Sequence, residues 1–106
     1  MFNEQRTTQR KVLKVKALVA PEAGAAVAAR TVDISSSGMC VSVADPMAVG
    51  ATAHVRFDLL VDGKPNTIQV KSRVTYCILS GNEFKVGFTF LNLDLSSMTT
   101  LAKFLR

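Results

Sequence analysis

The chain has 106 residues, of which 48% are hydrophobic and 20% charged, and its formal net charge at pH 7 is +5. This length fits a single domain with its own hydrophobic core, and the composition excludes an intrinsically disordered chain. The longest apolar stretch, residues 17–29, is interrupted by Pro21, Glu22 and Gly24, which excludes a membrane-spanning helix.

Most of the positive charge lies in the first 16 residues. They hold five Lys or Arg side chains against one acid, Glu4, while the rest of the chain is close to neutral. A concentrated basic segment favours an anionic partner, such as a nucleotide, a nucleic acid or an acidic surface, but a solvated end fits equally well. No apolar region follows the polar start, which disfavours a signal peptide, so we expect a cytoplasmic protein.

Arg6 and Arg10 stand in the run RTTQR within this basic segment. Four residues apart, they are neighbours in a helical turn or up to about 13 Å apart in an extended chain, and either spacing lets them hold a compact dianion. Guanidinium binds phosphate, pairs with guanine or stacks on a base. We predict that residues 1–11 form a flexible arm, because Phe2 is their only large apolar side chain to offset the entropy of ordering.

Alternation of apolar and polar residues in the remainder predicts six antiparallel strands. Every second residue is apolar over long stretches, as in half-buried strands, and runs rich in Gly, Pro, Ser and Asn separate these stretches. The predicted strands are Val12–Ala20, Ala25–Ile34, Met39–Val43, Ala53–Val61, Thr67–Ile78 and Phe84–Phe90. Six short strands around one core predict an all-β barrel over residues 12–106.

The phase of the alternation assigns the core. In the fifth strand the apolar positions include Val74, Tyr76 and Ile78, and the phenylalanines at 57, 84, 88 and 90 share the apolar phases. Binding of single-stranded nucleic acid needs aromatic rings on an exposed sheet face, so this pattern disfavours that function.

The last stretch, LDLSSMTTLAKFLR, changes to a helical period. Asp94 or Ser96 can cap its start. The apolar residues that recur at spacings of three and four are Leu95, Met98, Leu101 and Leu105. We expect one amphipathic C-terminal helix that closes an open end of the barrel.

Asp33, Ser35 and Gly38 stand in the run DISSSG, between the second and third predicted strands. An ionised Asp can accept two hydrogen bonds from the N1–H and N2–H₂ edge of guanine, and Ser35 adds a small donor and acceptor beside it. Gly38 permits a positive φ and a close approach of ligand to the backbone. Asp and Ser also stabilise many ordinary turns, so this motif alone decides nothing.

No catalytic constellation emerges from the other candidate residues. His54 is the only histidine and falls on the polar side of a strand, and Ser35–Ser37 lack the GxSxG context of a hydrolase. Cys40 and Cys77 lack metal-ligand spacing and are expected to be free thiols. We therefore expect no enzyme, no metal and no cofactor.

Together, the two motifs resemble the signature of the PilZ domain family of bacterial cyclic di-GMP receptors. That signature is RxxxR before the first strand and [D/N]xSxxG between the second and third; Arg6–Arg10 and Asp33–Gly38 match both. The runs VGATAHVRFDL and VGFTFLNL also look like the family's fourth and last strands. The resemblance implies a six-stranded antiparallel barrel with one C-terminal helix, and a binding module that is not an enzyme.

The resemblance also implies the roles of the motif residues in binding cyclic di-GMP. The arginines would wrap the guanines and phosphates, and the turn would hold a guanine edge. The implied ligand-binding residues are Arg6, Arg10, Asp33, Ser35 and Gly38. Many relatives have a further Arg where this chain has Gln5, which leaves open whether one ligand or a stacked pair is bound.

As a receptor, the chain is expected to fold Arg6–Arg10 onto the 33–38 turn when ligand binds, with the barrel unchanged. It would then act through an unidentified downstream protein or by oligomerising, in motility, biofilm or pilus control by family resemblance. Two alternatives remain at this point: a barrel that binds a protein without ligand, and, less favoured, a barrel that binds single-stranded nucleic acid.

Overall fold

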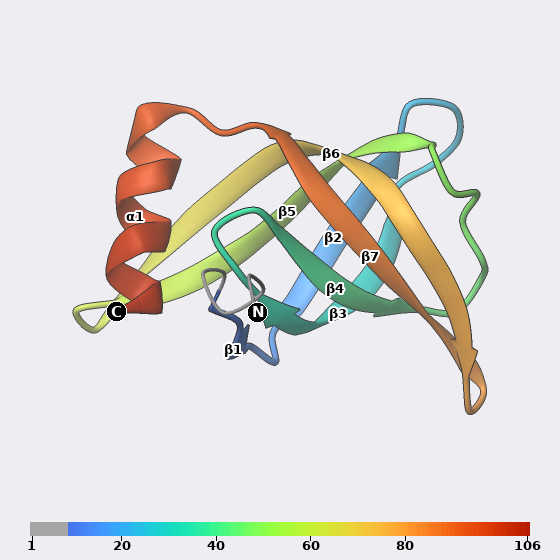
Figure 1. Ribbon diagram of the computed structural model, residues 1–106, viewed down its shortest axis with the longest axis horizontal. Coiled ribbons are helices and arrows are strands. Elements are labelled where there is room, and N and C mark those ends of the chain that lie inside the picture. The colour runs from blue at the N-terminus through green and yellow to red at the C-terminus, as the bar shows by residue number, and fades with distance from the viewer. Residues whose placement is uncertain (1–8) are drawn as a thin grey trace, which may run out of the picture.

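The computed structural model describes residues 9–106, in which seven strands and one helix form a barrel (Figure 1). The elements are β1 (Lys11–Val12), β2 (Lys16–Pro21), β3 (Val27–Ile34), β4 (Gly38–Val43), β5 (Thr52–Val61), β6 (Lys64–Ser80), β7 (Glu83–Asn92) and α1 (Leu95–Leu105). The strand order is β1-β3-β2-β5-β6-β7-β4, and pairing of β3 with β4 closes the sheet. The predicted six-stranded antiparallel barrel is confirmed, with one short extra strand.

The inward-facing side chains of the strands form one core. On β5, Ala53, Val55, Phe57 and Leu59 are buried, and the residues between them, His54 among them, are exposed. Strands with one buried face and one solvated face follow directly from this alternation. Burial of each large apolar side chain stabilises the fold by about 1.5–3 kcal/mol.

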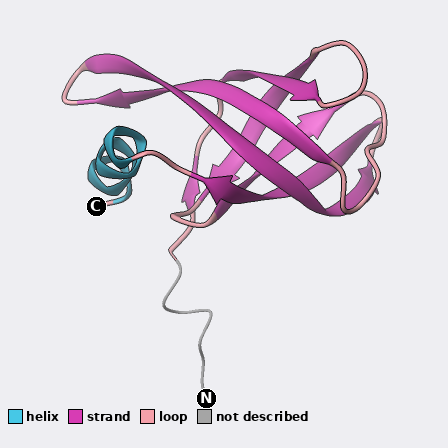
Figure 2. Ribbon diagram, turned by 90° about the horizontal axis from the view of Figure 1, so that it is seen from above, coloured by secondary structure: helices cyan, strands magenta, loops and turns pink. Residues whose placement is uncertain are grey.

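Helix α1 lies across one end of the barrel, beside β5 and β6 (Figure 2). Asp94 is its N-cap, and its side chain accepts a hydrogen bond of 2.7 Å from the backbone N–H of Ser97. Leu101 is buried against the core. The expected C-terminal helix is therefore confirmed. Within residues 9–106, no helix is long and apolar enough to cross a membrane.

The prediction of one continuous strand over Val12–Ala20 was wrong, because the chain breaks into β1 and β2. At the break, the Thr31 hydroxyl of β3 donates a hydrogen bond to Leu13 O and accepts one of 2.8 Å from Val15 N–H. The register of β3 also shifts between Thr31 and Asp33. A side chain thus takes part in the pairing at the break. That register shift concerns β4, and on the other edge of β3, β1 pairs with its end, where Val12 lies opposite Asp33.

A second register shift, between Val74 and Tyr76 in β6, reverses the side-chain phase. Val74 is buried, but Tyr76 and Ile78 are 40% and 57% exposed, and Cys77 packs partly against the core. The expectation that Tyr76 and Ile78 continue the inward phase was therefore wrong. A bulge adds one residue to a strand, and one residue is enough to exchange its two faces.

Candidate ligand-binding site

Arg10, the described arginine of the first predicted motif, meets the second motif at the surface of the barrel. Arg10 donates to Oδ1 of Asp33 from Nη2 at 2.6 Å and from Nε at 3.1 Å. Its Nη1 lies 3.4 Å from Oγ of Ser35. The pairing of β1 with the end of β3 places Arg10 here, because Val12 stands opposite Asp33.

The Asp33 carboxylate is only partly occupied by this contact. Both hydrogen bonds from Arg10 end on Oδ1, and among residues 9–106 nothing donates to Oδ2. The side chains of Arg10 and Asp33 are 45% and 31% exposed. The carboxylate is thus partly exposed, and within the described residues one of its two oxygens has no donor.

Ser35 is fully buried and holds the turn together. Its Oγ accepts hydrogen bonds from the backbone N–H groups of Ser37, at 3.3 Å, and Gly38, at 3.2 Å, and its own N–H donates to Gly38 O at 2.8 Å. Its hydroxyl lies within reach of Arg10. The structure therefore places Ser35 beside the predicted clamp, as the residue that shapes the turn.

The structure has a glycine at position 38 because the backbone of β7 passes close to it. Its φ is not among the positive values, which occur at other glycines, so the expected positive φ was wrong. A Cβ at this position would instead overlap the carbonyl oxygen of Phe88 on β7. Gly38 pairs with Thr89 of the same strand, so the glycine allows two backbones to approach closely.

A cavity of about 340 Å³ adjoins the ion pair. Arg10, Ser37, Gly38, Thr75, Tyr76 and Thr89 are among the residues that line it. Both β6 and β7 therefore contribute to the site, together with the N-terminal segment and the 33–38 turn. A ligand that contacts Arg10 can reach polar side chains from four different parts of the chain.

Tyr76 belongs to a row of residues that runs across four strands to Asp33. It pairs with Gly87, Gly87 pairs with Cys40, and Cys40 pairs with Asp33. Because Gly87 has no side chain, the Tyr76 ring lies directly over it. Hydrogen bonding to Cys40, then partial burial and the negative charges of Cys40 and Asp33, raise the pKa of Tyr76 to about 12. The hydroxyl is therefore a neutral donor at physiological pH.

Sequence reasoning missed Tyr76 as a site residue, because simple alternation assigns it to the apolar phase. Gly87 carries the signal that could have found it. A glycine inside a strand often marks a place where another group packs on the backbone. Here that group is the tyrosine ring of the neighbouring strand.

Arg6 and Gln5 lie outside the described residues, so their predicted places in the site stay predictions. Within residues 9–106, no cluster of three His, Cys, Asp or Glu side chains could hold a metal. Cys40 is buried and Cys77 half-buried, both as free thiols.

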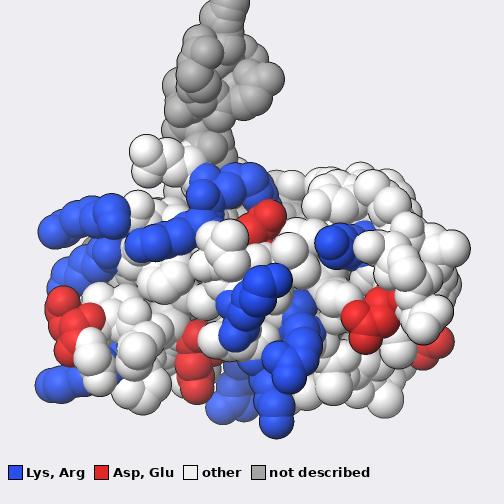
Figure 3. Space-filling model, turned by 90° about the horizontal axis from the view of Figure 1, so that it is seen from below, with Lys and Arg blue, Asp and Glu red and all other residues white. Residues whose placement is uncertain are grey.

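Viewed from below, Lys and Arg side chains gather over the middle of one face, with Asp and Glu scattered among them (Figure 3).

Lys11, next to Arg10, ties the start of β1 to the C-terminal helix. Its Nζ donates a hydrogen bond of 2.8 Å to the carbonyl oxygen of Phe104 and lies 4.9 Å from the centre of the Phe104 ring. Lys11 itself pairs with Ile34 at the end of β3. The root of the N-terminal segment is thus fixed between the 33–38 turn and α1.

Comparison with known proteins agrees with the fold and the motifs. The family model described as PilZ domain matches residues 4–106. No curated protein matches the sequence.

Among solved structures, the inhibitor of motility MotI/DgrA of Bacillus subtilis superposes with a TM-score of 0.80 at 15% identity, over 95% of this chain and 48% of that one. The PlzA protein of Borreliella burgdorferi, in complex with c-di-GMP, superposes with a TM-score of 0.67 at 14% identity, over 92% of this chain and 40% of that one. The PilZ domain of CeSA from a cellulose-synthesizing bacterium superposes with a TM-score of 0.61 at 19% identity, over 92% of this chain and 94% of that one. These likenesses concern the fold, and the chain spans about half or less of the first two proteins.

Proposed function

The chain belongs to the PilZ domain family, and on this basis we propose that it is a receptor for cyclic di-GMP, a binding module and not an enzyme. Arg6 and Arg10 act as the clamp for guanine and phosphate, and Asp33 reads a guanine edge. Ser35 and Gly38 support the turn that carries Asp33. The PlzA structure, with cyclic di-GMP bound to a protein of similar fold, supports the same ligand.

The observation that carries this proposal is the contact of Arg10 with both Asp33 and Ser35. Asp33 and Ser35 follow Arg10 by 23 and 25 residues in the chain, and the three side chains still form one cluster. The cluster offers what a guanine nucleotide needs: a guanidinium for phosphate or for guanine O6 and N7, and a carboxylate for N1–H and N2–H₂. The adjoining cavity supplies room and further polar side chains.

The ion pair does not block the site. An exposed pair of this kind contributes only about 0–1 kcal/mol, because water screens the charges. Cyclic di-GMP carries two phosphates, so Arg10 exchanges part of its contact with Asp33 for a phosphate or a base at little cost. Oδ2 of Asp33, to which no residue in 9–106 donates, is available for the first guanine contact.

Binding also rearranges the N-terminal arm in this proposal. Arg10 already lies against the turn, so the change concerns Arg6 and the residues between the two arginines. Ordering them costs about 1–2 kcal/mol per residue, which lowers the affinity and makes the arm a switch whose population depends on ligand. The covered barrel face and the ordered arm form the surface that a downstream protein recognises. Control of motility is one such process, as the name of MotI suggests.

Titration calorimetry with cyclic di-GMP tests the proposal and gives the affinity and the stoichiometry together. We expect saturable binding, with one ligand or a stacked pair per chain. Backbone NMR relaxation with and without ligand then tests the arm. Absence of binding heat at millimolar ligand would contradict the receptor function, and unchanged dynamics of residues 6–10 would contradict the switch alone.

A further inference from the structure

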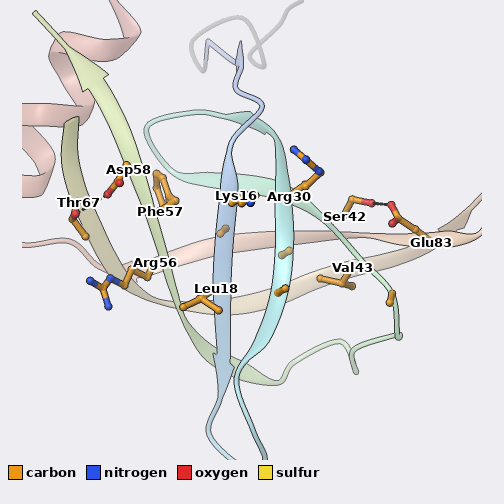
Figure 4. A pocket seen from close by; sticks show the side chains of 14 residues that line it. Lys16, Leu18, Arg30, Ser42, Val43, Arg56, Phe57, Asp58, Thr67 and Glu83 are labelled. Carbon is orange, nitrogen blue, oxygen red and sulfur yellow. Dashed lines mark hydrogen bonds between the residues drawn. The ribbon is translucent and has the colours of Figure 1, made fainter. Parts of the chain in front are cut away.

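A groove separate from the ligand site lies on the outer face of the sheet. It has a volume of about 650 Å³ and extends over β2, β3 and β5, with β4 and β7 at one rim (Figure 4). Leu18 and Ala28, a cross-strand pair, form an apolar strip of its floor, and Leu18 is 47% exposed. The groove is therefore apolar at its centre and polar around it.

Three cations surround this floor: Lys16, Arg30 and Arg56. Lys16 and Arg30 stand directly opposite each other on β2 and β3, and Arg56 stands opposite Leu18 on β5. Within residues 9–106, none of the three forms an ion pair. Like charges at directly opposed sheet positions repel and destabilise the sheet. An anion placed between them would remove that repulsion.

The two acids of the groove lie at its rims and are already hydrogen-bonded. Asp58 accepts a hydrogen bond of 2.6 Å from the Thr67 hydroxyl, and Glu83 accepts one from the Ser42 hydroxyl. Figure 4 shows these two pairs on opposite sides of the groove. They do not pair with the three cations around the floor, and they limit the length of any run of negative charge that can bind.

We propose that this groove binds a short acidic peptide segment of a partner protein, with carboxylates on Lys16, Arg30 and Arg56 and an apolar side chain over Leu18 and Ala28. The arrangement of charge selects this occupant. Carboxylates on either side of an apolar residue match an apolar floor surrounded by cations.

A nucleic acid fits the same groove less well. A continuous phosphate backbone would pass close to Asp58 or Glu83 at the rims, where like charges repel it. Phe57, the aromatic residue in the groove lining, is only 3% exposed and offers no stacking platform.

The groove and the proposed ligand site both draw residues from β3. Arg30 and Asp33 lie on this strand, on either side of its register shift. The inference deepens the proposed function, because a receptor that signals through a second protein needs a surface for that protein next to its ligand. A partner seated in the groove would reach the ligand-covered turn.

Selection from a random peptide library on the intact chain tests the inference. We expect the bound pool to be enriched in Asp and Glu beside an apolar residue. A synthetic peptide from that pool should bind Lys16→Glu and Arg56→Glu at least about tenfold more weakly, a loss of roughly one order of magnitude in affinity. Lys64→Glu is the matched control, since it makes the same charge change at an exposed strand position outside the groove, and it should bind as the unaltered chain does.

Thermal melts of the variants check folding, and Arg56→Gln provides a milder change at the same position. A pool without acidic enrichment, or equal losses in Lys16→Glu and Lys64→Glu, would overturn the inference. So would binding of an oligothymidine that Lys16→Glu abolishes, since it would assign the groove to nucleic acid. Calorimetry with cyclic di-GMP on the same preparations tests the receptor function separately, because neither Lys16 nor Arg56 lies in the ligand site.

Discussion

Arg10 and Asp33 form an ion pair in which one carboxylate oxygen accepts hydrogen bonds from two nitrogens of the same guanidinium. The other carboxylate oxygen accepts none from residues 9–106. The pair thus joins Arg10 to the 33–38 turn, and the second oxygen has no donor within the described residues. Residues far apart in sequence therefore lie in contact without any ligand present.

Substitution of Arg10 separates ligand binding from stability. Arg10→Ala removes a contact with phosphate or guanine, so calorimetry should show cyclic di-GMP affinity reduced by roughly ten- to a hundredfold. The melting temperature should change little, since the ion pair is half-exposed. Arg6→Ala should have a similar effect on affinity. Lys14→Ala, an exposed basic control outside the cavity, should bind normally; loss of affinity there would mean that only total charge matters.

Asp33 should determine the choice between bases. Adenine lacks the N1–H and N2–H₂ donor pair and presents an acceptor at N1, so cyclic di-AMP would desolvate the Asp33 carboxylate without donating to it. We expect the unaltered chain to prefer cyclic di-GMP by several kcal/mol over two bases, and Asp33→Asn to lose most of this preference. Competition titrations of both ligands measure it. Equal affinities in the unaltered chain would exclude recognition of the guanine edge.

Thr31 should stabilise the folded state through its hydrogen bonds to the segment between β1 and β2. Its buried hydroxyl bonds to Leu13 O and Val15 N–H, and Thr31→Val leaves both backbone groups without this partner. We expect a loss of about 1–3 kcal/mol in the free energy of unfolding, measured by urea titration. Thr67→Val deletes an exposed hydroxyl and should change stability by less than about 0.5 kcal/mol. Similar losses in both variants would contradict the assigned role.

Two glycines on adjacent strands should respond differently to a methyl group. In Gly38→Ala the new Cβ meets the backbone carbonyl of Phe88, which cannot move without the strand, so we expect a loss of about 1–3 kcal/mol or more. In Gly87→Ala it meets the ring of Tyr76, a half-exposed side chain that can rotate away. Thermal melts should show a smaller loss for Gly87→Ala, and the reverse order would contradict the close approach at Gly38.

Tyr76 is the only tyrosine of the chain, so absorbance of its phenolate reports its own titration. In the folded protein the midpoint should lie near the raised pKa of about 12, and in urea near the ordinary value of 10.0. Because the folded state holds this proton more tightly, its contribution to stability is complete below pH 10 and declines as the pH rises through 12. Cys40→Ala should lower the folded midpoint. A midpoint near 10 in the folded chain would contradict the contact with Cys40.

The regular parts of the fold follow from the sequence, and its irregular parts do not. Alternation in β5 predicts both its length and its inward face, and Asp94 marks the start of α1. The alternation of apolar and polar residues does not reveal the register shifts at Thr31 and Tyr76, because a bulge depends on hydrogen bonds to the neighbouring strand. Alternation alone therefore assigned Tyr76 to the wrong face.

In the candidate site, too, some features could be predicted from the sequence and others could not. The motif resemblance named Arg10, Asp33 and Ser35, and the structure places them together. Their spacing in the chain does not predict the contact, which depends on β1 pairing with the end of β3. The role of Gly38 depends on the backbone of β7, a strand about fifty residues later, and so could not be read locally.

The bond from Lys11 to the Phe104 carbonyl gives the helix a cation at its negative C-terminal end, where such a charge is stabilising. Lys11 directly follows Arg10, whose side chain pairs with Asp33. Two consecutive residues therefore join the 33–38 turn to the last turn of α1, and a deletion of that last turn would remove the acceptor of the Lys11 hydrogen bond. The C-terminal helix is thereby part of what positions the start of β1.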